Sequence, residues 1–175
     1  MIDPAGGPTR APEGGGYFAG SPRPLSPDDA VPARSLVYAA LGVTPYVDRV
    51  VEVLDQAARG GDPEARALVI ERDGTIAGLV IFGLVAGTRG AARLHSLVLD
   101  RGVNADDVGG RLTSAAATAV ATAGARLLLA EVPDDPALGP VSAVLRRNGF
   151  REEARVPDFF RDGVALCFLR RDLVP

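Results

Sequence analysis

His95, the only histidine of the chain, lies in an apolar run, Leu-His-Ser-Leu, that begins at Leu94. An imidazole that is neutral near pH 7 can take a proton from an ammonium group, so His95 is a candidate general base. A lone histidine on an apolar strand can equally be a packed, hydrogen-bonded core residue. Glu71 is a second candidate. It lies at a strand end beside a hairpin and would act through a water molecule, unless it is simply a solvated surface acid.

The stretch from Leu94 to Leu112 has the order of elements that favours an anion. An apolar strand passes through a polar turn into an Ala-rich helix, which we expect to begin just after Asp106-Asp107. The first N–H groups of a helix have no intrahelical partner and lie at the positive end of the helix dipole. Gly109 and Gly110 have no side chains, so a phosphate could come close to the backbone. The two aspartates are interpreted as an N-cap and a first-turn acid.

These residues need a scaffold, and the hydrophobic periodicity predicts a mixed α+β domain. Two helices come first, from Ser26-Pro27 to about Leu41 and from Thr44-Pro45 to Gly60-Gly61. Asp73-Gly74 predicts a hairpin. The expected order after the two helices is strand 67–72, strand 75–84, strand 92–99, helix 107–123, strand 126–132, helix 140–147, strand 150–156, loop 157–163 and strand 164–170. The strands on either side of the long helix should be parallel, because a crossover helix joins them.

The bulk composition limits the class of protein. With 175 residues, 47% hydrophobic and 23% charged, we expect one domain over residues 25–175, after a flexible Gly/Pro-rich tail over 1–24. A net charge of −3 and a pI near 5.2 argue against nucleic-acid binding. One cysteine, Cys167, excludes an internal disulfide, and no metal site is expected. No signal peptide or membrane span is recognisable, so we expect a cytoplasmic protein.

Three pieces of the sequence stand in the same order as in one known family. Residues 104–109 are similar to the pattern Arg/Gln-x-x-Gly-x-Gly/Ala, and residues 144–150 are similar to Leu-Tyr-x-x-x-Gly-Phe. Residues 157–163, followed by a strand that ends at 170–173, are similar to a common C-terminal ending of the family. Together with the order of the elements, over about residues 22–173, the chain resembles the GNAT superfamily of acyl-CoA-dependent N-acetyltransferases.

The resemblance implies a mostly antiparallel sheet flanked by helices, in which a bulged central strand splays away from a parallel neighbour and forms the acyl-CoA cleft. The Leu-His-Ser-Leu run resembles a strand of the arylalkylamine N-acetyltransferases in which the histidine faces the amine, which supports His95 as the base. The implied acetyl-CoA site combines a pantetheine strand with a diphosphate turn, formed by Leu97, Val98, Leu99, Asn104, Val108, Gly109, Gly110 and Arg111.

The resemblance also implies a pocket for the acceptor next to the first two helices. Tyr38 and Tyr46 lie on those helices and are candidates to line it, as are Phe159 and Phe160 in a later loop. Packing in the core is the alternative for each aromatic residue. The acceptor would be an amine on a small molecule or a peptide. Many members of the family are dimers, so a homodimer stays open.

Two departures from the family pattern bear on activity. Leu145 takes the place of the motif tyrosine, which in many members protonates the leaving thiolate, and Asp107 puts a carboxylate where a glycine should admit a phosphate. The expected function is direct transfer of an acetyl group from acetyl-CoA to an amine in a ternary complex. The alternative is a weak or inactive module that binds CoA or another ligand as a sensor or interaction protein.

Overall fold

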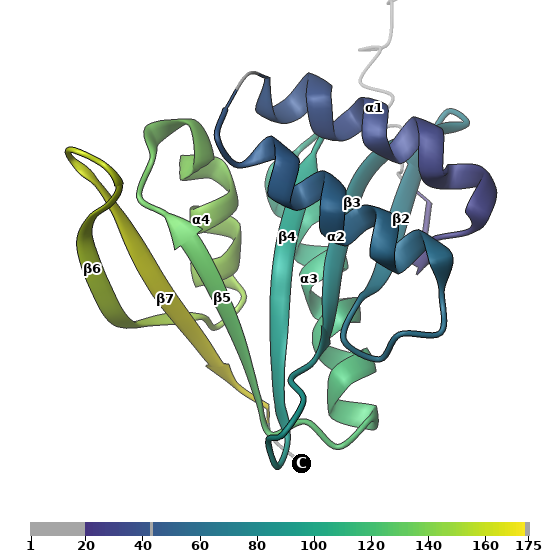
Figure 1. Cartoon of the computed structure of the whole chain (residues 1–175). Helices are drawn as coiled ribbons and strands as arrows, with labels where there is room; N and C mark the ends of the chain where they lie inside the picture. Colours follow the sequence, from purple (N-terminus) through teal and green to yellow (C-terminus); the bar gives the residue numbers. More distant parts are fainter. Residues whose placement is uncertain (1–19, 43, 174–175) are drawn as a thin grey trace, which may run out of the picture.

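The computed structural model describes residues 20–42 and 44–173. Within these residues a seven-stranded sheet is flanked by four α-helices (Figure 1). The strands are β1 (Arg23–Pro24), β2 (Arg66–Arg72), β3 (Thr75–Leu84), β4 (Ala91–Leu99), β5 (Leu127–Pro133), β6 (Arg151–Arg161) and β7 (Val164–Asp172). The helices are α1 (Ala30–Leu41), α2 (Val47–Arg59), α3 (Ala105–Thr122) and α4 (Gly139–Arg147), and 3-10 turns precede α1 and α4 at Pro27–Asp29 and Pro136–Leu138.

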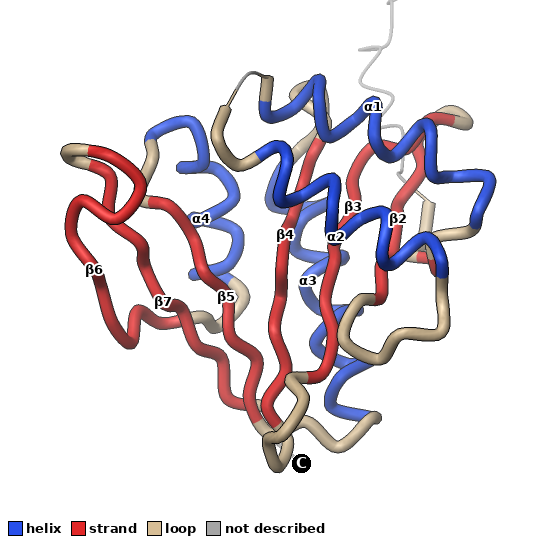
Figure 2. The backbone as a smooth tube through the Cα atoms, viewed as in Figure 1, coloured by secondary structure: helices blue, strands red, loops and turns tan. Residues whose placement is uncertain are grey.

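The strands lie in the order β1-β2-β3-β4-β5-β7-β6, and β4 and β5 are parallel while the other neighbours are antiparallel. Helices α1 and α2 cover one face of the sheet, and α3 and α4 cover the other (Figure 2). Each face has its own buried apolar cluster, because β2, β3 and β4 are buried on both sides. The predicted α+β fold is confirmed.

The parallel pair β4 and β5 stays together for only a short distance. The two strands pair from Ala91 with Leu127 to Leu94 with Ala130, and beyond that point they diverge (Figure 1). The register between β3 and β4 shifts at the same level, because Ile81 pairs with Ser96 whereas Phe82 pairs with Leu94. His95 is therefore the extra residue of a β-bulge, a feature that bends a strand and re-aims its side chains. The predicted bulged, splayed strand is confirmed.

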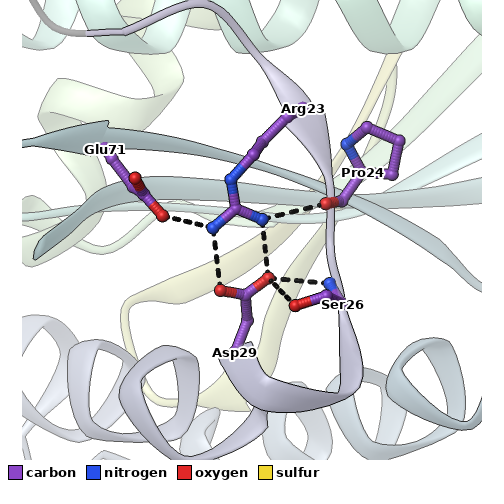
Figure 3. Close-up of polar contacts among 5 residues, drawn as sticks. All are labelled: Arg23, Pro24, Ser26, Asp29 and Glu71. Carbon is purple, nitrogen blue, oxygen red and sulfur yellow. Dashed lines mark hydrogen bonds and ion pairs between the residues drawn. The ribbon is translucent and has the colours of Figure 1, made fainter. Parts of the chain in front are cut away.

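A polar network ties the N-terminal segment to the open edge of the sheet (Figure 3). Arg23 donates to both carboxylate oxygens of Asp29, at 2.7 and 2.8 Å, and also pairs with Glu71. The backbone N–H and the hydroxyl of Ser26 donate to the same Asp29 carboxylate, each at 2.7 Å. Because Asp29 is buried, these bonds compensate the desolvation of its charge. The network positions the start of α1 against β2.

Some predicted boundaries were wrong. Helix α3 begins at Ala105 and is capped by Asn104, so Asp106-Asp107 lie inside its first turn. The predicted loop 157–163 is mostly strand, since β6 runs on to Arg161 as an edge strand, where a proline is tolerated. Most of the predicted tail, 1–19, lies outside the described residues, but Arg23–Pro24 pair with β2 and belong to the sheet.

Candidate functional site

A cleft of about 280 Å³ lies where β4 and β5 diverge. Its lining comes from the end of α1, the first part of α2, the bulged part of β4, the end of β5 with α4, and the β6–β7 hairpin. Most of the side chains that line it are apolar, which suits an acyl chain or a pantetheine arm. The polar and aromatic side chains in the lining are Tyr46, Arg49, Arg93, His95, Ser96, Glu131, Phe159 and Phe160.

The backbone of β4 offers hydrogen-bonding groups on the cleft side. The Asp100 N–H donates to the Ala77 carbonyl at 2.9 Å, so Asp100 faces β3. Alternate residues of an antiparallel strand face the same neighbour, so Val98 also directs its N–H to β3. The N–H and C=O groups of Leu97 and Leu99 therefore face the gap that β5 leaves. Of the three predicted pantetheine residues, Leu97 and Val98 line the cleft, whereas Leu99 lies outside its lining.

His95 is held at the bulge by one hydrogen bond. Its Nε2 lies 2.9 Å from the backbone carbonyl of Glu64, which can only accept, so Nε2 carries the proton and Nδ1 the lone pair of the neutral ring. Burial lowers the pKa of His95 below its ordinary value of 6.5, and Arg93 and Arg49 lower it further. The ring is therefore neutral at pH 7 with a free basic nitrogen.

Charged side chains surround His95 on the α2 side of the sheet. Arg93 lies on the side of β4 opposite the buried Leu94, and Glu131 lies on the side of β5 opposite the buried Ala130. The guanidinium Nη2 of Arg93 is 3.3 Å from Glu131 Oε1, so this pair bridges the two strands where they separate. Arg49 reaches the same cleft from α2.

An aromatic wall closes the cleft on the side of the β6–β7 hairpin. The rings of Tyr46 and Phe160 meet edge to face at 5.3 Å, and those of Phe160 and Phe159 do so at 4.9 Å. The Tyr46 hydroxyl donates to Asp135 at 3.2 Å, and Arg161 pairs with the same carboxylate at 2.9 Å. Burial, followed by the bond to Asp135, raises the pKa of Tyr46. The wall thus joins α2, the β5–α4 connection and β6.

Leu145 lies on α4 and borders the cleft at the position where the resemblance expects a tyrosine. Its side chain is almost fully buried, packs in the same apolar cluster as Val144 and Phe150, and has no proton to give. The nearby Cys167 belongs to this cluster too, and burial raises the pKa of its thiol, which therefore stays protonated and inert. Among the described residues, α4 contributes only apolar side chains to this wall of the cleft, Val141 and Leu145.

The start of α3 differs from the predicted diphosphate turn. The Asn104 side chain accepts from the N–H groups of Asp106 and Asp107, at 3.0 and 3.2 Å, and the Val108 N–H donates to the Asn104 carbonyl at 3.0 Å. These donors are therefore used within the helix. Asp106 also pairs with Arg147 of α4, and Asp107 is exposed to solvent. This helix terminus is neutralised by its own residues.

The predicted diphosphate cradle from Val108 to Arg111 lies within α3, after the first three residues of the helix. Val108 is buried in the core. A side chain at Gly109 would lie 3.0 Å from a Val144 methyl carbon, so this glycine allows α3 and α4 to approach closely. Arg111 donates to the Gly20 carbonyl at 2.8 Å. The structure therefore assigns Gly109 to the packing of α3 against α4, and its role beside a phosphate stays a prediction.

Two predicted residues lie away from the cleft. Glu71 is part of the network around Arg23 on the β1–β2 edge, so it does not reach an amine bound next to His95. Tyr38 projects from α1 with 51% of its surface exposed and is absent from the lining. The structure instead brings Tyr46, Phe159, Phe160 and His95 together.

Sequence reasoning missed Arg93 and Arg49. Arg93 stands two residues before His95 in a mostly apolar strand, and its charge at that position was the available signal. Arg49 gave none, because it is an ordinary polar residue of an amphipathic helix. Over residues 20–42 and 44–173, no cluster of His, Cys, Asp and Glu side chains suits a metal ion. Over the same ranges, no helix is long and apolar enough to cross a membrane.

The sequence matches no family model, and no curated protein is similar to it in sequence. Solved structures do resemble it. A protein from Desulfovibrio desulfuricans assigned to the GNAT family of acetyltransferases has a TM-score of 0.76 and 24% identity, covering 88% of this chain and 99% of that one. A Salmonella typhimurium protein, yncA, solved with acetyl-CoA, has a TM-score of 0.68 and 18% identity over 88% and 94%.

The ribosomal-protein-S18-alanine N-acetyltransferase of Escherichia coli is also similar, with a TM-score of 0.70 and 14% identity over 89% of this chain and 94% of that one. The divergent β4 and β5, the bulge between them and these likenesses define the class: the chain has the GNAT fold. The solved structures reported above are those of acetyltransferases, and one of them is assigned to the GNAT family.

Proposed function

We propose that the protein transfers an acetyl group from acetyl-CoA to an amine by direct transfer in a ternary complex. The observation that carries this proposal is the cleft at the divergence of β4 and β5, with a neutral histidine at the bulge and unpaired strand groups beside it. A similar fold solved with acetyl-CoA supports the choice of donor. Acetyl-CoA here is a co-substrate.

The pantetheine arm of acetyl-CoA would lie between β4 and β5 as an added, strand-like partner. The free N–H groups of Leu97 and Leu99 would bind its amides and polarise the thioester carbonyl, which builds negative charge during attack. The apolar side chains of β5 and α4, among them Val132 and Leu145, would exclude water from the acyl group.

His95 would deprotonate the amine through Nδ1. The nitrogen then attacks the thioester carbon, a C–N bond forms, the C–S bond breaks and the thiolate leaves. The amine loses one proton and the CoA thiol gains one, so the products are the N-acetyl compound and CoA. Because Leu145 cannot donate, this proton would come from water or from the substrate. General acid catalysis typically raises the rate about 10²–10⁴-fold, so we expect slow turnover without it.

A binding module is the second candidate, and the start of α3 favours it. The first-turn N–H groups are already bonded to Asn104, and Asp107 places a negative charge where a diphosphate should lie. Such a site would bind CoA weakly and, without an acid, would turn over slowly. The protein would then sense CoA or another ligand.

Calorimetric titration with acetyl-CoA, followed by thiol release with a panel of amines, tests both candidates. If the protein is an acetyltransferase, we expect it to bind acetyl-CoA and to release CoA only when an amine is present. Binding without release by any amine would favour the sensor. Absence of binding at millimolar acetyl-CoA would reject both.

A further inference from the structure

The charged side chains next to His95 form a more elaborate arrangement than transfer to a simple amine would need. Arg93 and Glu131 form an ion pair that spans the two strands on the α2 face, directly beside His95. Arg49 adds a second guanidinium from α2. The amine would therefore meet a positive and a negative group side by side.

Arg93 has a donor without a partner. Its Nη2 pairs with Glu131, but its Nε is buried and has no hydrogen-bond partner among the described residues. The buried Nε itself is out of reach of a ligand, but the Arg93 side chain as a whole is 40% exposed, so the outer edge of its guanidinium is accessible. A guanidinium matches a carboxylate with two parallel bonds, so this outer edge would bind a ligand carboxylate.

The charges around the cleft are balanced in pairs, because Arg93 pairs with Glu131 and Arg49 pairs with Glu52 at 2.7 Å. A zwitterion matches this arrangement, because its carboxylate would face Arg93 while its ammonium lies near Glu131 and His95. The remaining lining is apolar and ends at the wall of Tyr46, Phe159 and Phe160.

We propose that the acceptor is a free amino acid with an apolar or aromatic side chain. Its carboxylate binds Arg93, its amine faces His95, and its side chain lies against the aromatic wall. This inference rests on the proposed function, because it names the substrate of the same cleft. The carboxylate contact would distinguish a free amino acid from a protein N-terminus. The first residue of a protein carries a peptide amide in place of that carboxylate.

The test compares matched acceptors with acetyl-CoA as donor. Phenylalanine, leucine and methionine are each assayed beside the corresponding amine that lacks the carboxylate and beside the corresponding amide. For at least one set, we expect kcat/KM for the acid to exceed those for the amine and the amide by about tenfold to a hundredfold, the range for one charged hydrogen-bonding contact. Equal or faster reaction of the amine or the amide would overturn the inference.

Variants of Arg93 test whether this residue causes the preference for the acid over the amine. Arg93→Gln should raise KM for the acid by at least about tenfold with little change in kcat, and should abolish the preference over the amine. Arg93→Lys should keep part of the preference, because it keeps the charge. Arg59→Gln, at an exposed position on α2 outside the cleft, is the matched control and should behave as the wild type. A preference unchanged in Arg93→Gln would remove the carboxylate contact from Arg93 and contradict the proposal.

Binding measured without turnover separates this inference from the proposed function. Phenylalanine, leucine and methionine, each beside its amine, are titrated by calorimetry into the protein saturated with CoA. Preferential binding of the acids without any acetyl transfer would overturn the enzyme and keep the ligand class. Transfer to amines without preference would keep the enzyme and overturn the ligand class, and neither binding nor transfer would overturn both.

Discussion

At the scale of single residues, the site depends on how neighbours fix protonation. The Glu64 carbonyl occupies the N–H of His95 and leaves the other ring nitrogen as the base, while burial lowers the pKa of the ring. A general base works only when it is unprotonated, so a lowered pKa keeps His95 active down to a lower pH. The ring therefore suits attack by an amine at neutral pH.

The first prediction concerns the pH dependence of kcat/KM when His95 is the base. The acidic limb of kcat/KM should have its midpoint below 6.5, the ordinary value for histidine, because the pKa is lowered. His95→Ala should reduce kcat/KM by about 10²–10⁴-fold and remove that limb, while the affinity for acetyl-CoA changes little. The measurement is a rate profile from pH 5 to 9. An unchanged rate or an unchanged limb in the variant would exclude His95 as the base.

Asp107 is the second residue whose charge should matter. Asp107→Asn removes a negative charge from the start of α3, where the CoA diphosphate is expected, and keeps a side chain of similar size. We expect the Kd for CoA to fall about twofold to tenfold, with the larger effect at low salt. Asp48→Asn, in the exposed first turn of α2, is the control for the loss of a first-turn acid. A Kd that rises in the Asp107 variant alone would show that the carboxylate helps binding.

At the scale of elements, periodicity and turn residues predicted the order of helices and strands, because each buries an apolar face of regular spacing. The start of α3 was misplaced, since Asn104, Asp106 and Asp107 are all good caps and sequence cannot choose between them. The cleft was harder to predict. The bulge at His95 shifts the phase of β4, and Arg93 meets Arg49 and Glu131 only once three separate elements are assembled.

The network that attaches the N-terminal segment gives a prediction for stability. The pKa of Asp29 is strongly lowered, first by the bonds from Arg23. Because the folded pKa lies below the ordinary value of 3.8, the stabilisation is fully present above that pH, begins to decrease below it and is lost as the pH falls through the lower folded pKa. Asp29→Asn should cost about 2 kcal/mol of unfolding free energy at pH 7, since it weakens several charged hydrogen bonds.

Urea unfolding at pH 7 and at pH 3 measures this effect. The difference between Asp29→Asn and the wild type should shrink at pH 3, where the wild type has begun to lose the same stabilisation. Asp28→Asn, at the adjacent exposed position, should change stability by less than about 0.5 kcal/mol. Equal losses in the two variants would mean that the Arg23 network contributes little to the attachment of α1.

At the scale of the whole molecule, the cleft lies between two parts of one sheet and separates them. Strands β1 to β4 and strands β5 to β7 are joined by a short parallel ladder, and past Leu94 and Ala130 the two strands diverge (Figure 1). The cleft lies between them. A ligand that pairs with both edges would replace the missing ladder. Donor binding should therefore stabilise the whole fold, and the pantetheine arm should carry most of that effect.

Thermal unfolding with three ligands tests this division. At about 100 times its Kd, acetyl-CoA should add about 2.7 kcal/mol, or roughly 5 to 10 °C in Tm. Adenosine 3′,5′-bisphosphate lacks the pantetheine arm and should give little shift, because the N–H groups at the start of α3 are bonded to Asn104. CoA should approach acetyl-CoA, as the two share the arm. An equal shift with the bisphosphate would place binding at the helix terminus and not between the strands, and the divided sheet would then be a consequence of packing rather than the donor site.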